Sequence, residues 1–191
     1  NKLIATKSGI IDTTYIAETS KKSYILKYYE REIKQKILLD AKLLDELNKI
    51  GLNVCVLLDK KDGWYIYTKL DGNHPKVIKT FHIQALARFL AKMHRYTYKK
   101  KLKNKFVDED ELAEMLDTVK QNYFYKYKKF FKLKKIVFKQ DGIIHGDIFK
   151  DNTVFDAKNK IGIFDFSDSG DGDFAFDVGI ALFGFGIKRK S

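Results

Sequence analysis

The spacing of hydrophobic and polar positions changes along the chain, and its first part has the spacing of strands. Two stretches rich in β-branched and aromatic residues, GIIDTTYIAET and SYILKYYE, occupy residues 9–19 and 23–30 and are separated by the polar tripeptide SKK. Residues of these types favour strands, and a short polar break between two strands favours a hairpin. We therefore expect the two stretches to pair antiparallel.

A helical pattern follows over residues 32–50. Its apolar positions recur at steps of three and four residues, and Gly51 supplies a residue that readily ends a helix in the left-handed conformation. These positions are Ile33, Ile37, Ala41, Leu44 and Leu47. Two further strand-like runs, NVCVLLD and WYIYTKL, are joined across residues 60–63. The pattern predicts an antiparallel sheet that carries one helix.

The pattern changes after Pro75, the only proline, in the segment LDGNHPK. Proline in a segment without periodicity is typical of a connection, here between two lobes. An amphipathic helix follows, and Asp108 with Glu111 has the pattern of a capping box that opens a second, longer helix. Apolar positions of the first helix are Leu86, Phe89, Leu90 and Met93. With short strands around TVFD and IGIFDF, we expect an α+β chain with lobes at residues 1–70 and 71–191.

Composition fits a globular protein. The chain has 191 residues, of which 45% are hydrophobic, and this is ample for a packed core. We expect no secretory leader and no membrane span, because the apolar run at residues 178–187 is short and rich in glycine. The single cysteine, Cys55, excludes a disulfide framework and favours a cytoplasmic protein.

The formal net charge of +12 raises nucleic acid as a partner. However, the basic residues are almost all lysine, whereas phosphate and base recognition more often recruits arginine. Arginine occurs only at Arg31, Arg88, Arg95 and Arg189. The dense stretches KKKLKNK and KYKKFFKLKK are typical of solvated helix faces and connectors. Nucleic-acid binding is therefore a distant alternative.

A polar stretch between two strand-like runs carries the candidate chemistry. His145, Asp147 and Asn152 lie in IIHGDIFKDN, and Asp165 ends the next strand in GIFDFSD. Asp, Asn and Gly are common turn residues, so one such motif alone would indicate only a loop. The linked pair has the order and spacing of a kinase catalytic loop and its metal-binding aspartate. Phosphoryl transfer needs a carboxylate for the attacking hydroxyl and oxygen ligands for Mg²⁺.

These motifs, HGDIFKDN followed by IGIFDFSDSGDGDFAFDVGIAL, resemble the aminoglycoside phosphotransferase and choline kinase superfamily, and within it the homoserine kinases of that fold. The resemblance implies a protein-kinase-like two-lobe fold with ATP and Mg²⁺ as cofactors. It further implies Asp147 as the catalytic residue, with Asn152 and Asp165 as metal ligands. Phe149 stands where eukaryotic protein kinases usually have lysine, and this favours a small-molecule acceptor.

The resemblance also implies a phosphate-facing lysine. Lys27 in SYILKYYE matches it by position, with a solvated strand lysine as the alternative. The helix carboxylate that orients this lysine best matches Asp40, although aspartate is shorter than the usual glutamate. Its rivals are Glu30, Glu32 and Glu46.

Two further segments are expected at the nucleotide. The stretch KSGIID, with Ser8 and Gly9, would cover the phosphates, although one glycine is a weak signal. The adenine would contact the segment that leads into the lobe connection, where strand ends expose backbone donors and acceptors. That segment is Tyr67, Thr68 and Lys69, up to Leu70.

Several other polar residues have two interpretations. His145 suits a structural hydrogen-bonding role better than that of a base, and His94 suits packing better than catalysis. Asp177 either braces the catalytic loop, as the resemblance implies, or caps a helix. An acidic cluster would either meet a cationic substrate or lie in a solvated loop; it comprises Asp168, Asp171 and Asp173.

The leading hypothesis is an ATP- and Mg²⁺-dependent kinase of a small hydroxylated metabolite, with homoserine as first candidate. Choline, ethanolamine and aminoglycosides are the alternative acceptors, and a nucleotide-binding pseudokinase is an alternative from a different class. The intact set of Asp147, Asn152 and Asp165 disfavours the pseudokinase. Because the family usually continues with further helices beyond GIKRKS, we expect the C-terminal lobe to be incomplete. The sequence does not indicate an oligomeric state.

Overall fold

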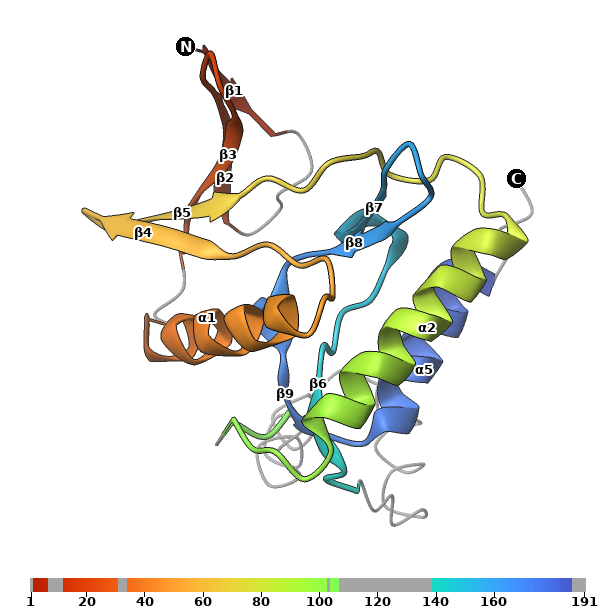
Figure 1. Cartoon of the computed structure of the whole chain (residues 1–191). Coiled ribbons are helices and arrows are strands. Elements are labelled where there is room, and N and C mark those ends of the chain that lie inside the picture. Colours follow the sequence, from red (N-terminus) through yellow and green to blue (C-terminus); the bar gives the residue numbers. More distant parts are fainter. Residues whose placement is uncertain (1, 7–11, 31–33, 103, 107–138, 187–191) are drawn as a thin grey trace, which may run out of the picture.

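The computed structural model describes residues 2–6, 12–30, 34–102, 104–106 and 139–186. Its N-terminal part is a five-stranded antiparallel sheet with the strand order β1-β2-β3-β5-β4 (Figure 1). The strands are β1 (Lys2–Ala5), β2 (Thr13–Glu18), β3 (Ser23–Tyr28), β4 (Leu57–Lys61) and β5 (Trp64–Thr68). The expected antiparallel sheet is therefore confirmed.

The pairing of β2 with β3 confirms the first predicted hairpin, and its register places Thr14 opposite Lys27. Strand β1 was not predicted; it pairs with β2. The prediction of a strand over NVCVLLD is wrong in its first half, because β4 begins only at Leu57. Val54 instead forms a parallel bridge with Ile163 and is buried in the core. Tertiary packing there outweighs strand propensity.

Helix α1 (Lys34–Lys49) confirms the predicted helix within two residues at each end of residues 32–50. Gly51 follows it at a φ of 82°, and the backbone N–H of Leu52 donates to the carbonyl of Leu47. These contacts satisfy the last carbonyls of the helix. Figure 1 shows α1 beneath the sheet, beside the strands that carry the C-terminal motifs.

Among the described residues, the C-terminal part contains two long helices, α2 (Thr80–Thr97) and α5 (Phe174–Gly186), which lie side by side (Figure 1). Two short antiparallel pairs complete it. Strands β7 (Thr153–Phe155) and β8 (Ile161–Ile163) form the predicted hairpin, whereas β6 (Gly142–Ile144) and β9 (Gly170–Gly172) form a pair that was not predicted. The predicted helix that begins near Asp108 lies outside the described residues.

The lobe connection is held against β7. Asn73 exchanges two backbone hydrogen bonds with Phe155, at 3.1 and 3.0 Å. Gly72 lies at a φ of 117°, and a Cβ there would come within 2.4 Å of the Phe155 carbonyl. Only glycine permits both the conformation and the approach. Gly72 therefore allows the connection to pack directly against the backbone of β7.

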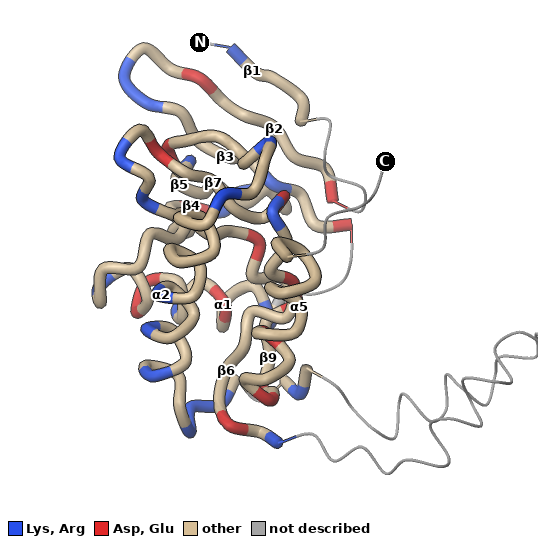
Figure 2. The backbone as a smooth tube through the Cα atoms, turned by 90° about the vertical axis from the view of Figure 1, so that its right-hand side faces the viewer, with Lys and Arg blue, Asp and Glu red and all other residues tan. Residues whose placement is uncertain are grey.

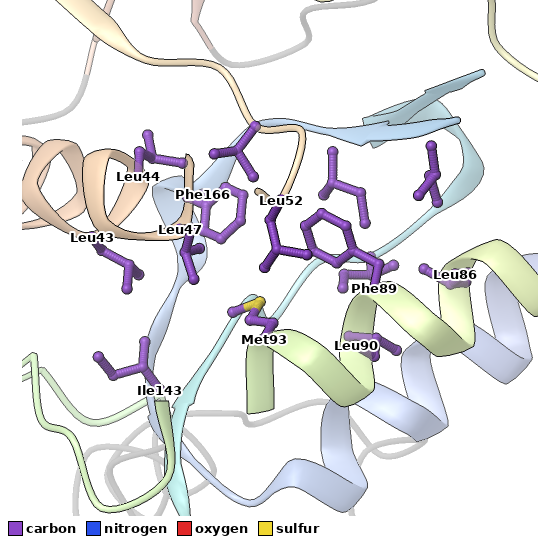
Figure 3. Packing of buried hydrophobic residues seen from close by; sticks show 14 of the residues in the cluster. Leu43, Leu44, Leu47, Leu52, Leu86, Phe89, Leu90, Met93, Ile143 and Phe166 are labelled. Carbon is purple, nitrogen blue, oxygen red and sulfur yellow. The ribbon is translucent and has the colours of Figure 1, made fainter. Parts of the chain in front are cut away.

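One hydrophobic core spans both parts of the molecule. It takes Leu43, Leu44 and Leu47 from α1, Tyr65 and Tyr67 from β5, and residues from α2 and the β7–β8 hairpin. Figure 3 shows Phe166 and Leu52 between the side chains of α1 and those of α2. Met93, near the C-terminal end of α2, is fully buried. The apolar stripes predicted for both helices therefore meet in one cluster.

Basic residues of the described chain are spread over many elements. Figure 2 shows Lys and Arg at the hairpin turns of the sheet and along α2, with no single stripe. Within the first lysine-rich run Lys99 and Lys101 are exposed, as predicted, while Lys100 contacts Glu46. The second run lies outside the described residues. No described helix has the length and apolarity that a membrane crossing requires.

Candidate active site

The loop that leads from β6 to β7 carries Asp147 and Asn152. The side-chain amide of Asn152 donates to Asp147 Oδ2 at 2.7 Å and to the Asp147 carbonyl at 2.8 Å. The backbone N–H of Phe149 also donates to that carbonyl, at 3.0 Å. The 3₁₀ helix Lys150–Asn152 turns the chain back so that these contacts form. The loop therefore brings Asp147 and Asn152 together and fixes the carboxylate of Asp147.

Asp177, on α5, holds the start of this loop. Its buried carboxylate accepts hydrogen bonds from the backbone N–H groups of His145 and Gly146, at 3.0 and 2.8 Å. His94 Nε2 donates to it from α2 at 2.9 Å. Burial alone would raise the pKa of this carboxyl, but the bond from His94 and the two N–H groups lower it. Of the two interpretations of Asp177, the geometry is that of the brace.

His145 connects the same loop to the end of β8. Its Nε2 lies 3.1 Å from the carbonyl of Phe164, and its Nδ1 lies 3.2 Å from the backbone N–H of Asp147. A carbonyl only accepts and an N–H only donates, so Nε2 is the donor and Nδ1 the acceptor in these two contacts. The residue is fully buried. These contacts are those of the structural role expected for His145.

Asp165 follows β8 and faces the sheet. Its Oδ1 accepts from Lys27 Nζ at 2.9 Å and from Ser167 Oγ at 2.8 Å. Its backbone φ of 62° is left-handed, which is uncommon for a residue with a side chain. Burial would raise the pKa of this carboxyl, but the charge and hydrogen bond of Lys27 outweigh it and lower the pKa. Asp165 therefore stays anionic.

Lys27 reaches this carboxylate from β3, but the expected pairing with Asp40 is wrong in this structure. Lys27 Nζ instead pairs with Asp165 and, at 3.3 Å, with Asp12 Oδ2. Both oxygens of Asp40 bind Lys36, one helical turn earlier, at 3.1 and 2.9 Å. Lys36 is therefore the nearer cation, and the short Asp40 side chain is already satisfied.

The rival carboxylates also bind other partners. Glu30 accepts from the hydroxyl of Thr13 at 2.8 Å, and Glu46 pairs with Lys100 at 3.1 Å. Glu32 lies outside the described residues. The residue that the sequence reasoning missed is Asp12, which had been considered only as the end of the phosphate-covering loop.

The other expected nucleotide contacts are described only in part. Ser8 and Gly9 lie outside the described residues. Tyr67 points into the core from β5, where its hydroxyl lies 3.0 Å from that of Tyr29, and burial raises the pKa of both groups. Thr68 Oγ1 accepts from the backbone N–H of Val56 at 2.9 Å, and Lys69 Nζ donates to the Leu70 carbonyl at 3.4 Å.

The acidic cluster has mainly structural contacts. Asp171 is buried and its Oδ1 accepts from the backbone N–H of Leu102 at 2.6 Å. Asp173 accepts from the N–H groups of Ala175 and Lys139 at 2.8 and 3.4 Å. Asp171 therefore ties a loop to β9 and Asp173 ties one to the start of α5, which disfavours the interpretation that the whole cluster meets a cationic substrate.

The two halves of the candidate site lie side by side. The backbone N–H of Phe164 donates to the carbonyl of Asn152 at 3.1 Å, so Asp165 follows directly after a contact with the loop. Burial raises the pKa of the Asp147 carboxyl, and the negative charges of Asp168 and Asp165 add to this. The site thus holds one carboxylate that stays ionised beside one that binds a proton more readily.

Asn152 and Asp165 fit a magnesium ion by the chemistry of their oxygens. The amide nitrogen of Asn152 is bound to Asp147, which leaves its Oδ1 as acceptor, and Asp165 keeps Oδ2 beside the oxygen that binds Lys27. Mg²⁺ prefers such hard oxygen ligands and usually takes one or two from protein, with water and phosphate supplying the rest. Accordingly, no group of three His, Cys, Asp or Glu in the described chain is arranged to hold a metal alone.

Comparison with known proteins identifies the class. The model of the phosphotransferase enzyme family matches residues 2–190, so the chain belongs to this family. It is similar to a homoserine kinase of Polaromonas naphthalenivorans (strain CJ2), with 23% identity over 212 residues, which cover 96% of the chain. The chain spans 65% of the length of that homoserine kinase.

Solved structures agree on the fold. The choline kinase LicA from Streptococcus pneumoniae superposes with a TM-score of 0.69 at 18% identity, over 100% of this chain and 71% of that one. The streptomycin–ATP complex of APH(2″)-IIa gives 0.64 at 16% identity, over 93% and 70%. The chain therefore has the protein-kinase-like α+β fold that the resemblance implied.

Proposed function

We propose that the protein is an ATP- and Mg²⁺-dependent kinase that phosphorylates the hydroxyl group of a small metabolite. The observation that carries this proposal is the contact of Asp147 with Asn152 at 2.7 Å, next to an Asp165 that Lys27 binds at 2.9 Å. In-line transfer needs a hydroxyl, a phosphate and a cation in one small volume, and we propose that these four side chains line it.

Asp147 is proposed as the group that orients the acceptor hydroxyl and accepts its proton. Its raised pKa makes it a stronger base than an ordinary aspartate, and Asn152 fixes its direction. Mg²⁺ would neutralise the β- and γ-phosphates, and Asn152 and Asp165 are its proposed ligands. Lys27 supplies a fixed positive charge for the nucleotide phosphates from β3.

Residues 1–70 are proposed as the nucleotide-binding lobe and residues 71–191 as the catalytic lobe. Asp40 is no longer proposed to orient Lys27, because Lys36 occupies it. Ser8 and Gly9 remain proposed phosphate contacts, and Tyr67, Thr68 and Lys69 remain the proposed adenine segment. Since the Tyr67 ring points into the core, its contribution would come from its backbone groups.

Homoserine is the first candidate acceptor, and the support is the 23% identity to a homoserine kinase. A second candidate, choline, has a structural argument. Phe149, two residues after Asp147, packs edge-on against the exposed Phe183 with ring centroids 6.3 Å apart. Aromatic faces bind quaternary ammonium groups, which choline carries and homoserine lacks.

The test is ATP consumption by the purified protein with homoserine, choline, ethanolamine and an aminoglycoside. We expect one acceptor to be phosphorylated with Mg²⁺, and Asp147→Asn to lower turnover of that acceptor steeply. Replacing Phe149 by leucine separates the two first candidates, because it should weaken choline binding but leave homoserine turnover within about twofold. Loss of Asp147 without any loss of phosphate transfer would contradict the proposed mechanism.

A further inference from the structure

A buried carboxylate of α1 has no part in the reaction proposed above. Asp40 is only 6% exposed, and both its oxygens contact Lys36 Nζ. Its Oδ1 also accepts from Ser169 Oγ at 2.8 Å. We call Lys36, Asp40 and Ser169 the Lys36 cluster.

The Lys36 cluster connects α1 with the segment that follows Asp165. Lys36 Nζ donates to the carbonyl of Phe166 at 3.3 Å and approaches Ser169 Oγ at 3.4 Å. Phe166 begins the 3₁₀ helix Phe166–Asp168, directly after Asp165, and Ser169 closes it with an N–H bond to the same carbonyl. One ammonium group thus binds both the helix carboxylate and the carbonyl of the residue that follows Asp165.

Because the Lys36 cluster is largely buried, its contacts are costly to break. Ser169 is fully buried, and the Lys36 side chain is 18% exposed. A buried charge that loses its partner costs several kcal/mol, so Asp40 and Lys36 do not separate freely. Phe166 is 2% exposed and belongs to the hydrophobic core, where it lies next to Leu47 of α1 (Figure 3). The segment after Asp165 is therefore held both by apolar packing and by the Lys36 cluster.

Asp165 needs such support because its backbone is strained. A left-handed φ in a residue with a side chain costs free energy, and it persists only where the surroundings determine it. Ser167 binds the Asp165 side chain from one side of the turn. Lys36 binds the carbonyl of Phe166, which is the next one along the chain.

We propose that Lys36 is a positioning residue: through Asp40 and Ser169 it holds the segment after Asp165 against α1 and so keeps the Asp165 carboxylate in contact with Lys27. This inference rests on the proposed function, since it assigns Lys36 to the same reaction. The sequence predicted that a carboxylate of α1, Asp40, would orient Lys27; the proposed role of α1 is different. The helix does not orient Lys27 directly; it orients the aspartate that Lys27 binds.

The test compares Lys36→Met with Lys36→Arg and with Lys49→Met, an exposed lysine of the same helix. Hydrogen exchange of the protein without nucleotide is measured in peptides covering residues 164–172. Turnover is measured in parallel. Lys36→Met should accelerate exchange in these peptides and lower kcat roughly 10- to 100-fold, the cost of a small misplacement of reacting groups. The acceptor KM should change less than about twofold, and Lys36→Arg should restore most of kcat.

Ser169→Ala keeps the proposal testable if Lys36→Met does not fold. It removes one hydroxyl and should accelerate exchange in the same peptides to a smaller extent. Unchanged exchange in both variants, or an equal effect of Lys49→Met, would overturn the proposal. If no acceptor is phosphorylated, the exchange experiment still decides whether the cluster holds the segment. If the wild type turns over an acceptor and Lys36→Met has a normal kcat, the positioning role is rejected while the proposed function stands.

Discussion

The two aspartates of the candidate site, Asp165 and Asp147, have pKa values that are shifted in opposite directions. Asp165 binds a lysine and a serine hydroxyl, and the result is a lowered pKa. Asp147 is partly buried and lies near other acidic groups, and together these raise its pKa although the hydrogen bond from the neutral Asn152 amide lowers it. Both residues are aspartates of short loops, so the difference comes from their neighbours and not from their type.

The comparison explains how one site can both bind a cation and accept a proton. A metal ligand must remain charged, and a lysine next to it ensures this at neutral pH. A base must bind a proton in the transition state, and a strong salt bridge would weaken it. A lysine binds the carboxylate of Asp165, whereas the amide of an asparagine binds that of Asp147.

The largest effect is expected for Asp147→Asn. The substitution keeps the shape but removes the base, so kcat should fall roughly 10²- to 10⁴-fold. Nucleotide affinity should change little, because Lys27 and Asp165 are intact. Steady-state kinetics and titration calorimetry with an ATP analogue measure the two effects. Asp59→Asn, an exposed aspartate of β4, is the control. Near wild-type turnover in Asp147→Asn would remove it from the mechanism.

Asp165→Asn should affect binding as well as turnover. Loss of groups that only support metal ligands typically costs roughly 10- to 100-fold in metal affinity, and loss of a charged ligand should cost at least as much. Titration of Mg²⁺ at fixed nucleotide checks this. An unchanged Mg²⁺ requirement would show that Asp165 is not a metal ligand. The proposed division of roles between Asp165 and Asp147 would then be wrong.

Asp177→Ala tests the support of the Asp147 end. The variant leaves the N–H groups of His145 and Gly146 and the ring of His94 without their buried acceptor. Removal of one member of a buried charged network costs roughly 3–5 kcal/mol in unfolding free energy. Urea unfolding measures this loss, with Asp59→Ala as the exposed control. A loss below about 1 kcal/mol, the scale of a single hydrogen bond, would contradict the brace.

Asp12→Asn should have a smaller effect, on the nucleotide side only. Asp12 is the second carboxylate at Lys27, and the loss of one such contact is worth on the order of 1 kcal/mol. The nucleotide KM should therefore rise roughly fivefold, while kcat changes little. Tighter nucleotide binding in the variant would mean that Asp12 competes with phosphate for Lys27 and does not orient it.

The smallest effect concerns stability and pH. Because the folded state raises the pKa of Asp147, ionisation of this group at neutral pH opposes folding, and Asp147→Asn should melt slightly higher than the wild type at pH 7. The advantage should shrink as the pH falls through that raised pKa, because the wild-type carboxyl is then protonated. Thermal melts between pH 7 and pH 4 check the sign. An advantage that grows at low pH would refute it.

The fold was largely predictable because its signals are local. The β2–β3 hairpin, α1, α2 and the β7–β8 hairpin each follow from periodicity and turn residues within one segment. The pair of β6 with β9 was missed because a strand of sequence GDG carries no strand propensity. Likewise, the start of β4 was misplaced because Val54 pairs with a residue more than 100 positions away.

The candidate site was predictable where its contacts are close in sequence. Asp147 and Asn152 are five residues apart, and their spacing indicated a shared loop. The partners of Lys27 were not predictable, because Asp12 and Asp165 reach it through strand pairing and the fold of the whole chain. Lys36 was missed for a further reason: among many lysines its sequence position carries no signal, and only the burial of Asp40 reveals its role.

The hydrophobic core that spans both parts has a consequence for folding cooperativity. Leu47 of α1 and Met93 of α2 are both fully buried in one cluster, which also contains the bridged pair Val54 and Ile163. A chain cut near residue 70 would expose the apolar face of each helix to water, and neither piece would have a complete interior. We therefore expect the lobes to be units of function but not of folding. A single sigmoidal transition should describe the denaturation of both.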